Sequence, residues 1–220
     1  MKKLIATALM LSCVSGANAA EKETTIEVIK EKVSAATDVA KSKMVAATEK
    51  VTSAVGIEEE NPFKVSSPDY NADEPIAALH LFNGFGCEGE NISPALSWHG
   101  APIETKSYAV TIYDPDAPTG SGWWHWVVYN IPANVTSLEM AASSTGLPEG
   151  AVQVRNDYSE HAYGGPCPPV GDEPHRYIVT VHALNAEVLK APKDASPALV
   201  GFMLNEHGIA KTELTAKYGR

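Results

Sequence analysis

The sequence predicts a mainly β domain with a few helices near its C-terminal end, preceded by one long amphipathic helix. From residue 62 onward, short apolar runs are interrupted by proline, glycine, asparagine and aspartate, which is typical of strands joined by turns. Residues 24–55 differ, because they contain no proline and no aromatic side chain and their apolar residues recur at helical spacing. The domain, residues 62–220, has about 160 residues and is large enough to bury a core of its own.

The overall composition excludes several classes of protein. Hydrophobic residues make up 44% of the 220 residues and charged residues 20%, so the chain is too apolar to be wholly disordered. The net charge of -10 leaves no basic surplus to neutralise phosphates, so no nucleic-acid partner is expected. No apolar run reaches the ~18 residues that a membrane-spanning helix needs, so no transmembrane segment is expected.

Residues 1–19 have the features of a cleaved export signal. Lys2 and Lys3 precede the apolar residues 4–14, and Ala17-Asn18-Ala19 supplies the small side chains that a signal peptidase accepts. We expect cleavage near Ala19 and a mature chain that is periplasmic or secreted.

Residues 20–61 form a predicted helical arm with an 11-residue repeat. Residues 30–40 and 41–51 match at six of eleven positions when Asp38 and Glu49 are counted as alike. The apolar positions follow a period of about 3.67 residues, which places them along one face of a single long helix. Three roles stay open for this alanine-rich face: a solvated spacer, self-association or docking of a protein partner through residues 24–55, and binding at a membrane interface.

The domain itself contains three segments with strand periodicity and two with helical periodicity. The expected strands cover residues 107–113, 124–131 and 176–184, and the expected helices cover 197–205 and 209–217. In the second strand, simple alternation places His125 on the same face as Val127, Tyr129 and Ile131.

Two cysteines remain after removal of the signal peptide, Cys87 and Cys167. In an oxidising compartment such a pair more often forms a disulfide than stays reduced, so we expect a bridge. Closing a loop of this length constrains the unfolded chain by roughly 4 to 5 kcal/mol at most. Two buried thiols are the alternative.

Three further segments concentrate residues that can do chemistry. Residues 114–118, Asp-Pro-Asp-Ala-Pro, form a stiff turn that can hold two carboxylates in a fixed geometry. Residues 123–130 place His125 in a strand of aromatic and apolar side chains, where it is either a core residue or a ligand-binding imidazole. Residues 163–177 are rich in proline and glycine and contain His175, so they read as a rigid binding loop or as a structural crossover.

Together these segments resemble the phosphatidylethanolamine-binding protein family, and most closely its bacterial, exported branch. The resemblance rests on residues 114–118, on Trp123 with His125, and on 165–169 followed by His-Arg-Tyr at 175–177; 86–94 and Trp98 agree with it. It implies a large antiparallel sheet packed on a smaller sheet, and a small anion pocket. Carried over by position, the ligand-binding residues are Asp114, Asp116, His125, Gly165, Pro168, His175 and Tyr177. Many eukaryotic relatives have two histidines after the motif tryptophan, and Trp124 in the first of these places is expected to reshape the pocket rim.

The chemistry of these residues favours a binding protein over an enzyme, with no cofactor or metal. The histidine imidazoles, the backbone amides near Gly165 and the Tyr177 hydroxyl can donate to an oxyanion such as phosphate or phosphoethanolamine. Asp114 and Asp116 are expected to orient the histidines or to accept from an ammonium group. Phosphate is then expected to bind more tightly below the histidine pKa than above it.

Two rival functions come from other classes. Asp114, Asp116, His125, His161 and His175 contain the ligand types of a hydrolytic metal site, although no HExxH, GxSxG or Walker motif accompanies them. Some relatives inhibit kinases or proteases, and outside the cytoplasm a protease inhibitor or a protein-interaction module is the more plausible of these roles.

Overall fold

The computed structural model describes residues 62–72 and 74–220. The predicted signal peptide, residues 1–19, and the predicted helical arm, residues 20–61, lie outside the described residues, so both stay predictions.

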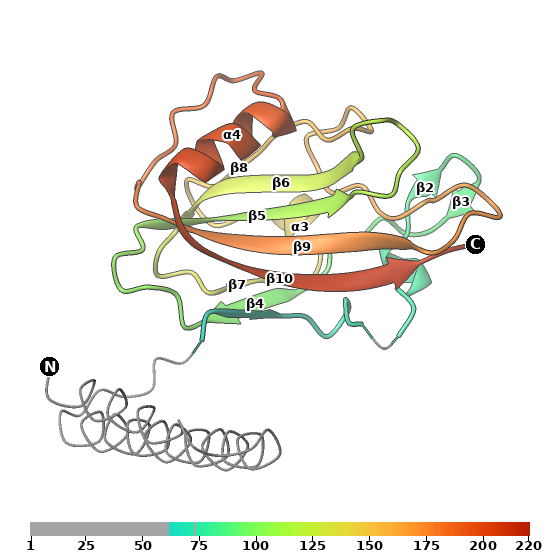
Figure 1. The fold of residues 1–220 in the computed structure, drawn as a ribbon, viewed down its shortest axis with the longest axis horizontal. Helices are drawn as coiled ribbons and strands as arrows, with labels where there is room; N and C mark the ends of the chain where they lie inside the picture. Colours follow the sequence, from blue (N-terminus) through green and yellow to red (C-terminus); the bar gives the residue numbers. More distant parts are fainter. Residues whose placement is uncertain (1–61, 73) are drawn as a thin grey trace, which may run out of the picture. The chain divides into compact units, whose positions relative to one another are not determined.

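Five antiparallel strands form a large sheet in the spatial order β10-β9-β5-β6-β8 (Figure 1). The bounds are β5 Ser107–Asp114, β6 Trp123–Pro132, β8 Val152–Gln153, β9 His175–Leu184 and β10 Gly208–Tyr218. Strands β5 and β9 lie inside the sheet and are rich in β-branched and aromatic residues, which suits strands buried on both faces. The three strands expected from the sequence are therefore confirmed.

A smaller sheet packs against one face of the large one, as expected. Its order is β1-β4-β7, and a separate hairpin is formed by β2 and β3. The bounds are β1 Lys64–Ser66, β2 Asn83–Gly84, β3 Cys87–Glu88, β4 Leu96–His99 and β7 Ser137–Leu138, with two short helices, η2 Ala78–His80 and α3 Ala142–Thr145. Trp98 of β4 meets Tyr108 of β5 edge to face, with ring centroids 5.4 Å apart, and both rings are buried between the sheets.

The other face of the large sheet is covered in part by helix α4, Pro197–His207. Val200 and Leu204 of this helix pack with Ala109 and Val127 in a second core cluster. The helix begins where the sequence predicts, because Pro197 occupies its first turn and the Ser196 hydroxyl accepts a hydrogen bond from the Leu199 amide.

The helix expected at residues 209–217 is wrong, because this segment is strand β10, paired with β9 along its length. Residues 210, 212, 214, 216 and 218 are all less exposed than residues 209, 211, 213 and 217. This alternation has the period of a strand. The open edge of β9 offers a full row of backbone partners, and this pairing outweighs the helical propensity of alanine, lysine and leucine.

The prediction that His125 shares a strand face with Val127 is also wrong, because the pairing of β6 with β5 is irregular. Trp124 pairs with Tyr113 and Trp126 with Ile112, so His125 is an extra residue between them. A bulge of this kind re-aims side chains. His125 accordingly lies against Tyr177, whereas Val127 packs in the cluster on the α4 side of the sheet.

The pairing brings chemistry-bearing residues to one end of the large sheet. Strand β5 ends there at Asp114, and β6 and β9 begin there at Trp123 and His175. Figure 1 shows the β2–β3 hairpin and the C-terminal end of β10 at the same end. Arg220 joins these parts, since its guanidinium donates to the carbonyl oxygens of Phe85, Gly86 and Pro168.

Candidate functional site

A hollow of about 160 Å³ lies at this end of the sheet. Strand ends supply its floor, and the β2–β3 hairpin and two loops supply its walls. It is lined by Phe85, Asp114, Ala117, Pro118, Thr119, Trp123, His125, Tyr158, Cys167, Pro168, Pro169, His175 and Tyr177. Five of the seven residues carried over from the family resemblance are therefore together at one site, namely Asp114, His125, Pro168, His175 and Tyr177.

Asp114 is a buried carboxylate whose oxygens are fully engaged. One oxygen accepts from the amides of Asp116 and Ala117, at 2.8 and 3.1 Å, and this holds the turn after β5. The other oxygen accepts from Nδ1 of His175 at 2.8 Å. Buried charges need such partners, so Asp114 fixes the position of the His175 ring. Nε2 of His175 has only a long contact, 3.5 Å, to a carboxylate oxygen of Asp172.

His125 is buried and held in one orientation. Its Nδ1 lies 2.6 Å from the carbonyl oxygen of Gly164, and because a carbonyl can only accept, Nδ1 carries the hydrogen. Nε2 is buried and has no hydrogen-bond partner. Burial lowers the pKa of His125 to about 4, although the Gly164 carbonyl and the nearby Asp114 charge oppose this. At neutral pH the ring is therefore uncharged, with a lone pair on Nε2.

Two further lining residues have buried polar atoms without a partner. They are Tyr177, through its hydroxyl, and Trp123, through the indole Nε1. Burial raises the pKa of Tyr177, so the hydroxyl keeps its proton and can donate. Buried polar groups are nearly always hydrogen-bonded in native proteins, and each exception calls for an explanation. Three such atoms around one hollow mark it as a place for a polar ligand or ordered water.

Asp116 does not line the hollow, contrary to the expectation from the motif. Its carboxylate accepts from Nε and Nη2 of Arg176 at 2.9 and 2.6 Å, and from the Arg176 amide at 2.9 Å. These bonds to Arg176 lower the pKa of Asp116 to about 2. Asp116 therefore ties the turn after β5 to the start of β9 instead of facing a ligand.

Gly165 also stays outside the lining, although Pro168 from the same loop is part of it. The Gly165 amide donates to the Asn91 side chain at 2.7 Å, so it is not available to an oxyanion. A Cβ at this position would lie 2.1 Å from the carbonyl oxygen of His80. The glycine is needed because two segments of backbone approach each other closely here.

The expected disulfide is confirmed between Cys87 and Cys167, 80 residues apart in the chain. It joins the β2–β3 hairpin to the loop that contributes Pro168 and Pro169. Because both partners lie in segments that wall the hollow, the bridge fixes the distance between these walls.

The sequence did not point to three residues of the wall, Phe85, Thr119 and Tyr158. Tyr158 stacks on Phe82 with ring centroids 3.8 Å apart, and its hydroxyl donates to the Gly165 carbonyl. Proximity to Cys87 in the sequence could have drawn attention to Phe85. Nothing in the sequence around Tyr158 points to the site, because its loop reaches the hollow only through tertiary packing.

Of the five residues of the rival metal site, Asp114, His125 and His175 line the hollow, but Asp116 and His161 do not. His161 is exposed, and its Nδ1 contacts the Gln153 carbonyl, while Asp116 is occupied by Arg176. Within residues 62–72 and 74–220, no group of three or more histidine, cysteine, aspartate and glutamate side chains is arranged to hold a metal ion. In the same part of the chain, no helix is long and apolar enough to span a bilayer.

Comparison with known proteins identifies the relatives of this chain. A family model described as phosphatidylethanolamine-binding protein matches residues 66–219. The chain belongs to the phosphatidylethanolamine-binding protein (PEBP) family. Among curated relatives, the UPF0098 protein YbcL of Escherichia coli is 54% identical over 159 residues, which cover 71% of this chain and 87% of YbcL. The UPF0098 protein YbhB of the same bacterium is 46% identical over 157 residues, 70% of this chain and 99% of YbhB.

Solved structures show the same PEBP fold. The crystal structure of E. coli YbcL, described as a new member of the mammalian PEBP family, superposes with a TM-score of 0.70 at 53% identity, covering 72% of this chain and 98% of that one. A putative PEBP homologue from Chlamydia trachomatis gives a TM-score of 0.61 at 32% identity, covering 73% and 99%.

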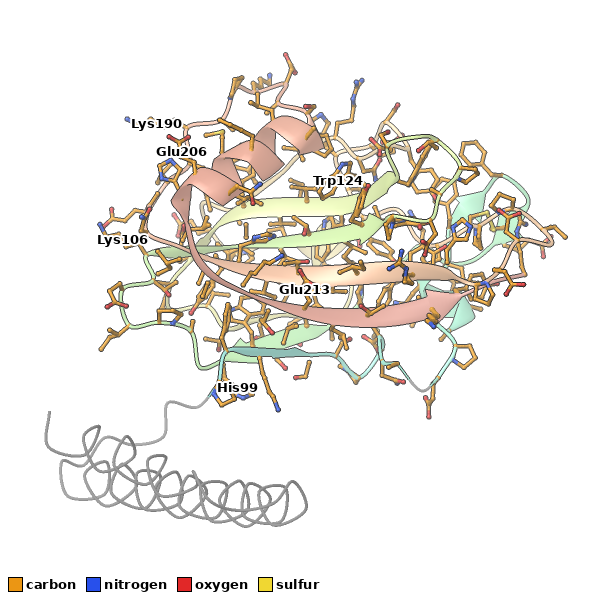
Figure 2. All side chains as sticks on the ribbon, viewed as in Figure 1. His99, Lys106, Trp124, Lys190, Glu206 and Glu213 are labelled. Atoms are coloured by element: carbon orange, nitrogen blue, oxygen red, sulfur yellow. A yellow bond between two sulfur atoms is a disulfide. The ribbon has the colours of Figure 1, made fainter. Side chains whose placement is uncertain are left out.

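Trp124, the departure from the PEBP motif, does not reshape the rim of the hollow. It is absent from the lining and packs against the core cluster on the α4 side of the sheet (Figure 2). There its ring lies 4.5 Å from that of Tyr113, centroid to centroid. Because side chains alternate along a strand, this position is turned away from the site that its neighbours Trp123 and His125 share.

Proposed function

We propose that this PEBP-family protein is an exported, non-catalytic binding protein whose hollow takes the phosphate group of a small ligand, such as inorganic phosphate or phosphoethanolamine. The observation that carries the proposal is the set of three buried, unpartnered polar atoms, on Trp123, His125 and Tyr177, around one hollow. The name of the matching family model, which refers to a phospholipid, supports a phosphate-bearing ligand.

The size and chemistry of the hollow suit a phosphate group. A volume of about 160 Å³ holds a few heavy atoms, well below the 300 to 1,000 Å³ typical of sites for larger ligands. The Tyr177 hydroxyl and the Trp123 indole donate to anionic oxygens, and hydrogen bonds to a charged partner are stronger than neutral ones.

Isothermal titration calorimetry with inorganic phosphate and phosphoethanolamine tests the proposal. Tyr177→Phe removes one donor and is expected to lower the affinity for phosphate about tenfold, since a hydrogen bond to a charged group contributes about 1.5–3 kcal/mol. Tyr129→Phe is the matched control, because Tyr129 is buried in the cluster on the α4 side. No binding of either ligand by the wild-type protein, or equal effects of the two substitutions, would refute the proposal.

Export is the second part of the proposal. It is supported by the pattern of residues 1–19 and by the Cys87–Cys167 disulfide, because disulfides persist mainly in oxidising compartments. Edman sequencing of the protein isolated from the periplasm or the medium is expected to begin at Ala20. An intact Met1 on the bulk of the protein would contradict export through this signal.

A second candidate function is docking of a protein partner, such as a protease, on the rim of the hollow. Phe85 and Val170 favour it, because they are 73% and 76% exposed beside the lining residues. Val170→Ser would then weaken capture of a partner from the periplasm and leave phosphate binding intact, because Val170 is absent from the lining. Phe85→Ser would weaken capture as well, but Phe85 also lines the hollow. If the same proteins are captured with and without Phe85, the rim is not the docking surface.

A further inference from the structure

The wall of the hollow contains an acceptor as well as donors. Nδ1 of His125 donates to the Gly164 carbonyl, so the neutral ring presents a lone pair on the buried, unpartnered Nε2. Trp123 can only donate, and the Tyr177 hydroxyl has one hydrogen to donate. A ligand that meets all three atoms must donate to Nε2 of His125 and accept from Trp123, and it can accept from the Tyr177 hydroxyl.

The surroundings of His125 keep its ring neutral. The rings of Tyr158 and Tyr177 enclose it, with centroids 5.7 and 5.1 Å away. The charged groups that act on it are Asp114 and Asp157. Asp114 is already bound to His175 and to two backbone amides. Burial therefore outweighs both carboxylates, and the pKa of His125 falls to about 4.

Phosphate groups differ in whether they bring a proton. A phosphomonoester loses its last acidic proton with a pKa near 6, so a fraction of it still carries a P–OH group at neutral pH. Inorganic phosphate has one hydrogen more, so both of its species at neutral pH carry a P–OH group. A phosphodiester and sulfate have oxygens of the same kind but no hydrogen to donate in this pH range.

We propose that the hollow selects phosphate groups that retain one acidic proton, namely inorganic phosphate and phosphomonoesters, over phosphodiesters and sulfate. In the complex the P–OH group donates to Nε2 of His125, while the anionic oxygens accept from Trp123 and Tyr177. This selectivity rests on the proposed phosphate binding. It makes the free headgroup phosphomonoester, and not the intact diester of a phospholipid, the preferred ligand.

The expected selectivity follows from which partner supplies the proton. At pH 7 about one phosphomonoester in ten carries it, given a pKa near 6. About one His125 ring in a thousand carries it at the same pH, given its pKa of about 4. The monoester supplies the proton about a hundred times more readily, so the affinity ratio is on the order of a hundredfold.

Calorimetry of the full chain with methyl phosphate, dimethyl phosphate, inorganic phosphate and sulfate tests this inference. Sulfate and phosphate have nearly the same size, so this pair controls for steric effects. At pH 7 the expected affinity is about a hundredfold higher for methyl phosphate than for dimethyl phosphate, and the ratio for phosphate over sulfate is expected to be at least as large. Above pH 6 the affinity for methyl phosphate should fall tenfold per pH unit. Titrations at pH 7.5 in two buffers of different ionisation enthalpy should show uptake of about one proton.

Variants separate the acceptor from the donors. His125→Phe should bring the ratio of methyl phosphate to dimethyl phosphate affinity close to one. Tyr177→Phe should weaken both ligands and preserve the ratio. If His125→Phe does not fold, the affinities of the two ligand pairs for the wild-type protein still test the selectivity.

The possible failures are distinguishable. Equal affinity for all four ligands leaves the phosphate site standing and overturns the selectivity. Absence of binding by every ligand refutes the proposed function, and the selectivity with it.

Discussion

The buried, neutral His125 should make the stability of this protein depend on pH. Its pKa is about 4 in the folded protein, against about 6.5 in the unfolded chain. The unfolded chain therefore binds the proton more readily, and the free energy of unfolding falls as the pH drops from about 6.5 toward 4. Above pH 6.5 the full stabilisation is present, and below pH 4 no more is lost.

The magnitude follows from the difference between these two pKa values, which is between 2 and 3 units. Each unit corresponds to about 1.4 kcal/mol, so the complete effect is about 3 kcal/mol, of which about 2 kcal/mol is lost between pH 7 and pH 4.5. His182 of β9, which pairs with Lys211 of β10, also has a pKa lowered to about 4, mainly by burial. The side chain of His182 is partly exposed to solvent, so its contribution to the loss of unfolding free energy over the same pH range should be smaller.

Urea unfolding at several pH values between 7 and 4.5 measures the effect. In the His125→Gln variant the loss of unfolding free energy over this range should be about 2 kcal/mol smaller than in the wild type. His161→Gln, a change at an exposed histidine, should leave the loss unchanged. If wild type and His125→Gln lose stability equally, or if the NMR signal of the His125 ring titrates above pH 6, burial does not keep this ring neutral.

Three further predictions concern the frame around the hollow. Replacing both Cys87 and Cys167 by serine should lower the free energy of unfolding by up to about 4 kcal/mol in denaturant titrations, and an unchanged midpoint would show that the bridge does not constrain the unfolded chain. Gly165→Ala should lower the free energy of unfolding by about 2 kcal/mol or more, because the new Cβ meets a backbone oxygen. Gly201→Ala, at an open position on α4, should raise it by about 0.5–1 kcal/mol. A higher melting temperature for Gly165→Ala than for Gly201→Ala would contradict this packing. Asp116→Asn should lower the free energy of unfolding by about 0.5–1 kcal/mol and change the phosphate affinity by no more than about twofold. A large loss of phosphate affinity would show that Asp116 contacts the ligand.

Local sequence features predicted most of the regular structure. Alternation of side chains located β5, β-branched and aromatic residues located β6 and β9, and helical periodicity from Pro197 located α4. These features succeed because turns, caps and strand faces depend on neighbouring residues. The prediction for residues 209–217 was wrong because their composition suits a helix, and only pairing with the free edge of β9 makes them a strand.

Five of the seven residues expected at the candidate site line the hollow, but the sequence did not decide which carboxylate of the stiff turn does so. Asp114 and Asp116 are two residues apart in one stiff turn, yet one carboxylate lines the hollow and the other binds Arg176 on the outside. Tyr158 carried no local signal, although its ring forms part of the wall.

The sequence by itself determined that the chain contains a mainly β domain, that Cys87 and Cys167 form its expected pair, and that three motifs supply carboxylates and imidazoles. Only the tertiary structure decided which of these groups meet a ligand. The pairing of β5, β6 and β9 brings their ends together, and the bulge at His125 turns that ring toward Tyr177. The physical reason is that burial and hydrogen-bond partners, which fix the proton on Nδ1 of His125 and leave Nε2 free, come from residues distant in the chain.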